Sequence, residues 1–288
     1  MDDAALLVDP EYGEVLDTKR VFLVQLQKKA VKVILFALFS LVWGCLWIIF
    51  IPDILSSLFG FIVFILPGSF FVIWLCTIYA KIREAFWRQL ALKYKWEYTA
   101  SKDISKEKAL LFKVGDSASA AHGINGSYNG QPFHIFEYEY TIGTGKNKQT
   151  FSFTVFEVKF SGTFPHLYLN YKKDWYSNTP PLFSSLAKIS VPEEFEKKFK
   201  LYAPKEYEIE TLEIFTPDVF AALLDLKWNH DMEFVDGELV IYRKAKFSNF
   251  KSLDAELDKI KKFVDILSPL LNRLKLTQIG DISPMLKN

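Results

Sequence analysis

Cysteine is nearly absent from this sequence of 288 residues, and both copies, Cys45 and Cys76, lie in one apolar block. Two cysteines in such a block argue against a disulfide framework and a thiolate metal site, and we predict two small hydrophobic residues instead. Histidine is also scarce. The four copies lack the short spacing of zinc ligands, so we expect ordinary surface or hydrogen-bonded residues: His122, His134, His166 and His230.

An excess of charge of either sign is also missing. The chain has 35 basic and 34 acidic residues, for a net charge of +1. Proteins that bind nucleic acids normally carry a basic face or a strongly basic domain. The balance therefore argues against a nucleic-acid partner.

Complete catalytic motifs are absent as well. The segment Gly143-Thr144-Gly145-Lys146 is similar to the end of a phosphate-binding loop, but Tyr140 replaces the earlier glycine and Asn147 replaces the magnesium-binding hydroxyl. We predict a hairpin turn there. The segment Gly115-Asp116-Ser117 has neither the strand and elbow context of a serine hydrolase nor a recognisable downstream Asp/His element.

Paired acids give no stronger signal. Glu137 and Glu139 alternate along a predicted strand, where acids usually form a solvated face and not a catalytic pair. We therefore assign no catalytic, cofactor-binding or metal-binding residue and no cofactor. The sequence favours a protein that is not an enzyme.

A long apolar run is the most prominent feature that is present. From Val33 to Ala80 the only charged residue is Asp53, and the run is about twice the roughly 20 residues that cross a bilayer. It predicts two transmembrane helices, 33–51 and 54–80. Basic residues flank both ends and the intervening turn has none, which predicts a multi-pass protein of the cell membrane with both termini cytoplasmic.

Four segments follow from this interpretation. They are a cytoplasmic tail and juxtamembrane helix at 1–32, two transmembrane helices at 33–80, a juxtamembrane stalk helix at 81–100 and a cytoplasmic α+β domain at 101–288. The predicted fold class is therefore α+β: a two-helix transmembrane hairpin followed by a soluble domain with a mostly antiparallel sheet and packed helices.

Hairpin turns and alternating residues predict the sheet. Asn129-Gly130 and Asp236-Gly237 are typical two-residue hairpin turns. Phe136, Tyr138 and Tyr140 alternate with acids, as in a half-buried strand. Apolar residues of both parities between Phe151 and Phe160 predict a bulge or a strand buried on both faces.

Helices are also expected in the same domain, the first of them a short one after Ser105. Pro192 opens one, with glutamates four residues before lysines, and Thr216-Pro217-Asp218 opens another. From Leu253 to Leu274 apolar residues follow four-three spacing, and Pro269 should bend or end that helix. This stripe either packs on the sheet or forms an exposed coiled-coil seam for self-association; we favour packing.

One resemblance covers most of the chain after the apolar run. It rests on the segments Phe195-Glu196-Lys197-Lys198-Phe199-Lys200-Leu201-Tyr202-Ala203-Pro204-Lys205, Tyr207-Glu208-Ile209 and Phe215-Thr216-Pro217-Asp218-Val219. These resemble a family of uncharacterised bacterial membrane proteins that have a two-span N-terminal hairpin and a cytosolic domain of unknown function. The resemblance implies that architecture and no site residues.

Three functions fit these observations. The first is a membrane-anchored binding or scaffold module, because the domain is rich in aromatic residues and strands and poor in catalytic spacing. The second is a lipid-interacting, pleckstrin-like domain at the membrane surface. The third is a membrane-associated enzyme without an assignable motif. The expected partners are the lipid bilayer and a protein partner or a second copy of the chain.

Overall fold

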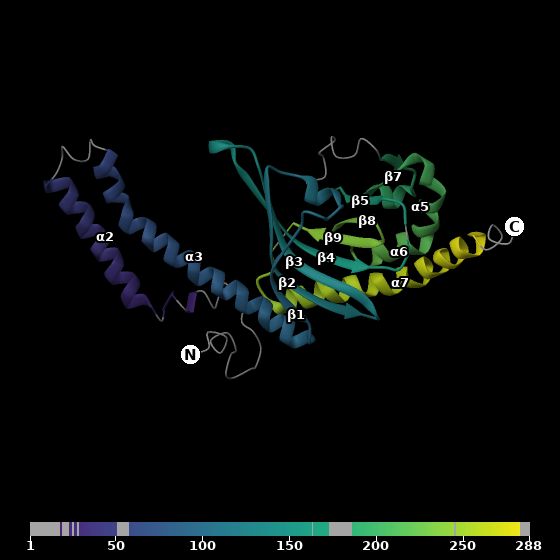
Figure 1. The fold of residues 1–288 in the computed structure, drawn as a ribbon, viewed down its shortest axis with the longest axis horizontal. Helices are drawn as coiled ribbons and strands as arrows, with labels where there is room; N and C mark the ends of the chain where they lie inside the picture. Colours follow the sequence, from purple (N-terminus) through teal and green to yellow (C-terminus); the bar gives the residue numbers. More distant parts are fainter. Residues whose placement is uncertain are drawn as a thin grey trace. The chain divides into compact units, whose positions relative to one another are not determined.

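A computed structural model describes most of the chain (Figure 1). The described residues are 18, 23–24, 26–27, 29–50, 58–162, 164–172, 186–244 and 246–282, and side chains are described for all of these except 30, 37, 46–50, 58–67 and 275–282. These residues divide into two units. One lies within Met1–Leu90 and Ser248–Phe250, and the other within Ala91–Phe247 and Lys251–Asn288.

The first unit contains two helices, α2 (Ala30–Phe50) and most of α3 (Leu58–Tyr94). Aromatic rings hold α2 and α3 together, since the rings of Phe36 and Phe71 stack with their centroids 5.0 Å apart. Many aliphatic side chains on these helices stay exposed, among them Leu41 and Ile73, which are 65% and 59% exposed. The unit therefore presents an apolar surface.

The predicted membrane topology is wrong. Among the described residues, no helix combines the length and the apolar character that a membrane crossing requires. The transmembrane hairpin in the predicted fold class and the multi-pass location are both corrected, and the predicted Pro52-Asp53 turn lies outside the described residues.

The second unit is built on one nine-stranded sheet with the order β1-β2-β3-β4-β9-β8-β5-β7-β6. Every described strand pair is antiparallel, as the hairpin signals predict. The strands are β1 (Glu97–Lys102), β2 (Ser117–Tyr128), β3 (Gln131–Ile142), β4 (Gln149–Lys159), β5 (Leu167–Tyr171), β6 (Ala187–Ile189), β7 (Phe199–Ala203), β8 (Asp231–Val235) and β9 (Glu238–Arg243).

Local turn chemistry sets the hairpins of this sheet. Asn129 and Gly130 join β2 to β3 with φ values of 50° and 78°, and Asp236 and Gly237 join β8 to β9 with φ values of 52° and 78°. Two positive φ angles are those of a type I′ turn, whose twist matches that of paired strands. Both predicted hairpins are confirmed.

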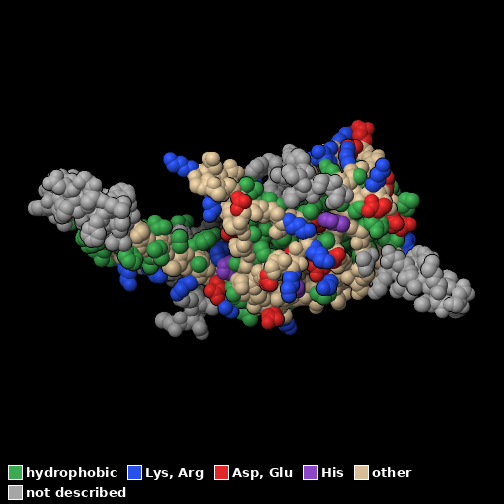
Figure 2. All heavy atoms as spheres, turned by 45° about the horizontal axis from the view of Figure 1, so that its top comes forward, with side chains coloured by type: hydrophobic (Ala, Val, Ile, Leu, Met, Phe, Trp, Pro, Cys, Tyr) green, Lys and Arg blue, Asp and Glu red, His purple; other side chains and the backbone are tan. Residues whose placement is uncertain are grey.

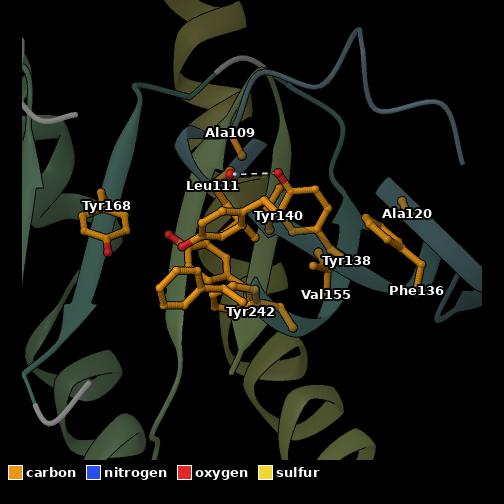
Figure 3. Packing of buried hydrophobic residues seen from close by; sticks show 12 residues of the cluster. Ala109, Leu111, Ala120, Phe136, Tyr138, Tyr140, Val155, Tyr168 and Tyr242 are labelled. Carbon is orange, nitrogen blue, oxygen red and sulfur yellow. Dashed lines mark hydrogen bonds between the residues drawn. The ribbon is translucent and has the colours of Figure 1, made fainter. Parts of the chain in front are cut away.

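One face of the sheet carries an aromatic cluster (Figure 3). Tyr138 and Tyr140 of β3 pack there with Phe153 of β4 and Tyr242 of β9, and all four are buried. The 3-10 helix η2 (Leu110–Lys113) lies over this cluster, where the Tyr138 hydroxyl donates a hydrogen bond of 3.3 Å to the Leu111 carbonyl oxygen. Side chains on both faces of β4 are buried, and its register with β3 is unbroken. Of the two predicted alternatives for this segment, the strand buried on both faces is therefore confirmed and the bulge is not.

The long helix α7 (Phe250–Ile282) packs on the opposite face of the sheet. Leu253, Leu257, Ile260 and Leu267 are fully buried within the chain. The apolar stripe with four-three spacing therefore packs in the core, as we predicted, and does not form an exposed coiled-coil seam. Pro269 lies inside α7, and the helix continues for more than three turns beyond it.

Shorter helices complete the second unit. The predicted helix start at Thr216 is confirmed in α6 (Pro217–Asp225), because the Thr216 hydroxyl accepts a hydrogen bond from the Val219 amide. Helix α5 (Glu208–Ile214) precedes it. The helix predicted after Pro192 is much shorter than expected: α4 comprises Glu193–Glu196. Alternating burial from Phe199 onward and pairing with β5 make the next segment strand β7.

Candidate functional site

The structure does not bring the sequence-predicted polar residues together into one centre. The part of the chain that the structure describes contains no group of three His, Cys, Asp or Glu side chains that could hold a metal ion. Each histidine lies beside a different partner: His122 with Tyr98, His134 with Glu157, His166 with Glu233 and His230 with Glu256. The Asp116 carboxylate accepts a hydrogen bond of 2.8 Å from the Gly143 amide, which links two turns.

The acids of β3 differ from their predicted role. Glu137 is 4% exposed and is not part of a solvated face. Lys246 explains this arrangement, because its ammonium lies 3.5 Å from a Glu137 oxygen and 2.9 Å from a Glu139 oxygen. The lysine follows β9, more than 100 residues away in the sequence, so strand alternation alone could not reveal it.

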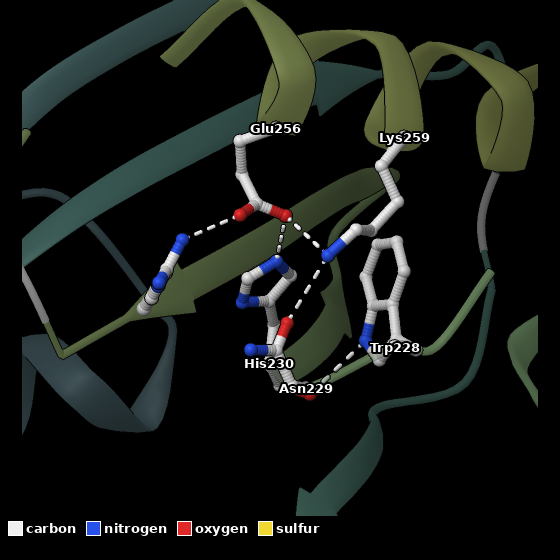
Figure 4. Close-up of polar contacts among 6 residues, drawn as sticks. Trp228, Asn229, His230, Glu256 and Lys259 are labelled. Carbon is white, nitrogen blue, oxygen red and sulfur yellow. Dashed lines mark hydrogen bonds and ion pairs between the residues drawn. The ribbon is translucent and has the colours of Figure 1, made fainter. Parts of the chain in front are cut away.

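A buried ionic cluster joins α7 to the sheet (Figure 4). His230 Nε2 lies 2.5 Å from one Glu256 oxygen, and Arg243 donates to the other oxygen over 2.5 Å. Lys259 approaches Glu256 to 2.8 Å and donates to the Asn229 side-chain oxygen over 3.2 Å. His230 is fully buried and Glu256 is 5% exposed. Because a substrate cannot reach these groups, we interpret the cluster as structural.

Burial lowers the pKa of the His230 imidazole below its ordinary value of 6.5, although the hydrogen bond with Glu256 acts in the opposite direction. Burial raises the pKa of the Glu256 carboxyl, but hydrogen bonds and charge from His230 and Lys259 outweigh it and lower the pKa to about 2. The carboxyl is therefore ionised in the folded protein at neutral pH.

These two groups predict a loss of stability in acid. When the folded state lowers the pKa of a group, the unfolded state binds the proton first as the pH falls. The free energy of unfolding therefore decreases as the pH falls below the ordinary pKa of that group. The contribution of His230 should decline below pH 6.5, and that of Glu256 between pH 4.5 and about 2. Urea unfolding at about pH 7.5, 5.5 and 3.5 should show decreasing free energies of unfolding. Equal values at all three would contradict the prediction, and Glu256→Gln should flatten the lower part of the profile.

A second buried polar group lies under the aromatic cluster. Glu233 accepts hydrogen bonds from the Leu110 amide over 2.8 Å and the Tyr242 hydroxyl over 3.2 Å, and His166 lies 3.0 Å away. Asp231, on the same strand face, accepts a hydrogen bond of 2.6 Å from the Tyr171 amide. Glu233 anchors η2 to the sheet and Asp231 bonds the end of β5, so oxygens of both acids already accept hydrogen bonds. This arrangement is also structural.

A groove between α2 and α3 is the feature best suited to a ligand. It has a volume of about 300 Å³ and is lined by Phe36, Phe70, Phe71, Trp74 and Lys32. Ligand sites are typically apolar pockets of about 300–1,000 Å³ with a few placed polar groups. The groove meets the lower end of that range with four aromatic rings and one cation.

The aromatic lining is arranged as a continuous stack. The ring of Phe71 lies 5.0 Å from that of Phe36 and 5.8 Å from that of Trp74, measured between centroids. Phe70 also lines the groove and is 65% exposed. Figure 2 shows hydrophobic side chains gathered over α2 and α3. The groove thus offers an apolar wall with one side open to solvent.

Positive charge lies at one end of the part of the groove that the structure describes. Lys29 and Lys32 are three residues apart at the start of α2, and Phe36 follows four residues later, so the three occupy one face of the helix. The ammonium of Lys29 lies 5.8 Å from the centroid of the Trp74 ring. An anionic group at this end would meet two lysines, while an attached apolar chain would follow the aromatic rings.

Sequence reasoning missed this groove for a definable reason. Its aromatic residues fall within the run from Val33 to Ala80, which composition alone explained as lipid-facing. The available signal was Lys29 and Lys32 at helical spacing from Phe36. The pairing of α2 with α3 was needed to bring these residues beside Phe71 and Trp74.

Comparisons with known proteins give one structural likeness. No protein family matches this chain, and no curated protein matches it. The crystal structure of the mycobacterial trehalose monomycolate transport factor A, TtfA, is similar with a TM-score of 0.47 and 12% identity. The likeness covers 64% of this chain and 96% of that chain. Similarity at this level supports no functional inference, so the proposal below depends on the groove alone.

Proposed function

We propose that this protein is a binding module for an anionic amphiphile, a molecule with one apolar chain and a negatively charged head. The observation that carries the proposal is the groove between α2 and α3, where four aromatic rings lead to a lysine. Aromatic walls favour an apolar chain because its burial removes both surfaces from water. Lys32 and Lys29 favour an anionic head through charge and hydrogen bonding.

A fatty-acid-like ligand suits these dimensions and charges. Each buried methylene contributes about 0.8 kcal/mol, so a chain of several methylenes provides useful affinity even in a half-open groove. Aromatic exposure supplies the same driving force on the protein side, because Phe70 is 65% exposed in the free protein. A neutral amphiphile would bury its apolar chain but would make no ionic interaction with the lysines, so it should bind more weakly.

The test uses dodecanoate and 1-dodecanol as probes, titrated by calorimetry into the full chain. Dodecanoate should bind more tightly. Phe70→Ala should lower the affinity for dodecanoate by at least about tenfold, since burying a phenylalanine side chain contributes about 1.5–3 kcal/mol. Ile73→Ala is the matched control, because Ile73 is also exposed on α3 but does not line the groove.

The charge term is tested separately. Lys32→Gln should lower the affinity for dodecanoate by up to about fivefold, which is the range for one exposed ion pair. The affinity for 1-dodecanol should not change. Lys146→Gln removes one exposed positive charge from the second unit and should have no effect. Equal affinity for both probes, or equal losses in Phe70→Ala and Ile73→Ala, would contradict the proposal. In that case the apolar surface of α2 and α3 serves protein contact instead.

A further inference from the structure

Three aromatic rings lie close to the ammonium of Lys261 in the second unit. The Nζ atom lies 4.9 Å from the centroid of Tyr94, 5.4 Å from that of Tyr128 and 5.9 Å from that of Trp96. All three distances are within the roughly 6 Å over which an aromatic face attracts a cation. We call Tyr94, Trp96 and Tyr128 the aromatic cage.

Charge pairing does not account for the position of Lys261. Among the described residues no carboxylate forms a salt bridge with it, although its neighbours Lys259 and Lys93 pair with Glu256 and Asp254. Its ammonium is instead placed by the faces of three rings. The cage therefore already holds one cation without a salt bridge from any carboxylate among the described residues.

The backbone builds one wall of the cage. Helix α3 ends in a Schellman arrangement, with Lys95 at a φ of 57° and the Trp96 amide donating to the Ala91 carbonyl oxygen over 2.8 Å. This turn places Trp96 over Gly126 of β2. A Cβ atom at Gly126 would come within 2.2 Å of the indole, so glycine is required for this close approach.

Two carboxylates of α7 orient the tyrosines. The Tyr94 hydroxyl donates to Asp254 over 2.6 Å, and the Tyr128 hydroxyl donates to Asp265 over 2.8 Å. A phenol that donates to a carboxylate gains electron density on its ring, which strengthens its attraction for a cation. Trp96 is fixed in turn by stacking on Tyr94, with centroids 4.9 Å apart.

We propose that the aromatic cage is a binding site for small quaternary ammonium compounds, such as choline, and that Lys261 occupies it until the ligand displaces it. Aromatic cages recognise quaternary ammonium groups because these carry a diffuse charge and cannot donate hydrogen bonds to water. Lysine is a flexible and strongly hydrated cation, so its ammonium can move to solvent on its four-carbon stem. The site is separate from the groove and does not depend on the function proposed above.

Calorimetric titration of the full chain with choline chloride tests this site. Lys261→Met keeps the length of the four-carbon stem and removes the competing ammonium, so choline should bind the variant at least about tenfold more tightly than it binds the wild-type protein. Lys262→Met is the matched control, because Lys262 is the exposed neighbour on α7. The affinity of the Lys262→Met variant for choline should equal that of the wild-type protein.

Two further measurements test whether binding requires the positive charge of the ligand and the rings of the cage. The neutral isostere 3,3-dimethylbutanol should bind far more weakly than choline, and Trp96→Leu in the Lys261→Met background should abolish choline binding. Tyr128→Leu serves the same purpose if Trp96→Leu fails to fold. Tighter binding of choline than of phosphocholine would indicate free choline as the ligand, and the reverse would indicate a phosphocholine headgroup; both outcomes support the cage.

The opposing results are equally definite. If Lys261→Met binds choline no more tightly than the wild type or Lys262→Met, the cage only fixes α7 to the sheet and the proposal is wrong. Equal affinity for choline and 3,3-dimethylbutanol would also overturn it. Failure of dodecanoate to bind the groove would leave all of these comparisons unaffected.

Discussion

Ile260→Ala is expected to lower the free energy of unfolding of the second unit by about 2–5 kcal/mol, the range for truncating a buried aliphatic side chain. Ile260 is fully buried in the middle of α7, between Leu257 and Val264, which are also fully buried. The large cost follows because the surrounding side chains close only part of the cavity. Leu257→Ala should give a loss of similar size.

Urea unfolding followed by circular dichroism measures this change. Lys262→Ala, on the exposed face of the same helix, should alter stability by no more than about 0.5 kcal/mol. Sedimentation adds a second criterion, because a core helix predicts that association state does not depend on Ile260. A folded monomeric Ile260→Asp variant from a dimeric parent would show that α7 is a self-association surface instead.

Glu256→Ala should cost about 3 kcal/mol, close to the lower end of the 3–5 kcal/mol found when one partner of a buried ion pair is removed. The variant leaves the His230 ring and the Arg243 guanidinium without their shared acceptor. The cost stays near the lower limit because the side chains of Arg243 and Lys259 are 34% and 21% exposed and retain contact with water.

Denaturant unfolding at neutral pH gives the value directly. Asp258→Asn is the matched control, because it neutralises an exposed carboxylate two residues away on the same helix and should change stability by no more than about 0.5 kcal/mol. A double-mutant cycle with Arg243→Ala then separates the pair interaction from the loss of packing. A loss in Glu256→Ala as small as that of Asp258→Asn would contradict the structural role of this cluster.

Local features were predictable from the sequence because their causes are local. The turns at Asn129-Gly130 and Asp236-Gly237 need two residues with positive φ, and these residue pairs supply them. Thr216 caps α6 with its own hydroxyl. The four-three stripe of α7 is a periodic signal long enough to indicate one buried face.

Predictions failed where distant partners outweigh local preference. The glutamate and lysine pairs after Pro192 favour a helix, but pairing with β5 and β6 draws Phe199–Ala203 into the sheet as β7. Glu137 is buried because Lys246 reaches it from beyond β9. The apolar run from Val33 to Ala80 was interpreted from composition alone, and that interpretation is corrected by the described helices.

The sequence by itself determined the two-residue hairpin turns, the Thr216 cap of α6 and the buried stripe of α7, because each depends on residues close to one another in the sequence. Only the tertiary structure decided the strand order, in which β9 and β8 lie between β4 and β5. It also decided both candidate binding sites. The groove needs α2 beside α3, and the aromatic cage needs Lys261 beside residues more than 130 positions earlier. Contacts at such separations depend on how the whole chain packs, and no local pattern encodes them.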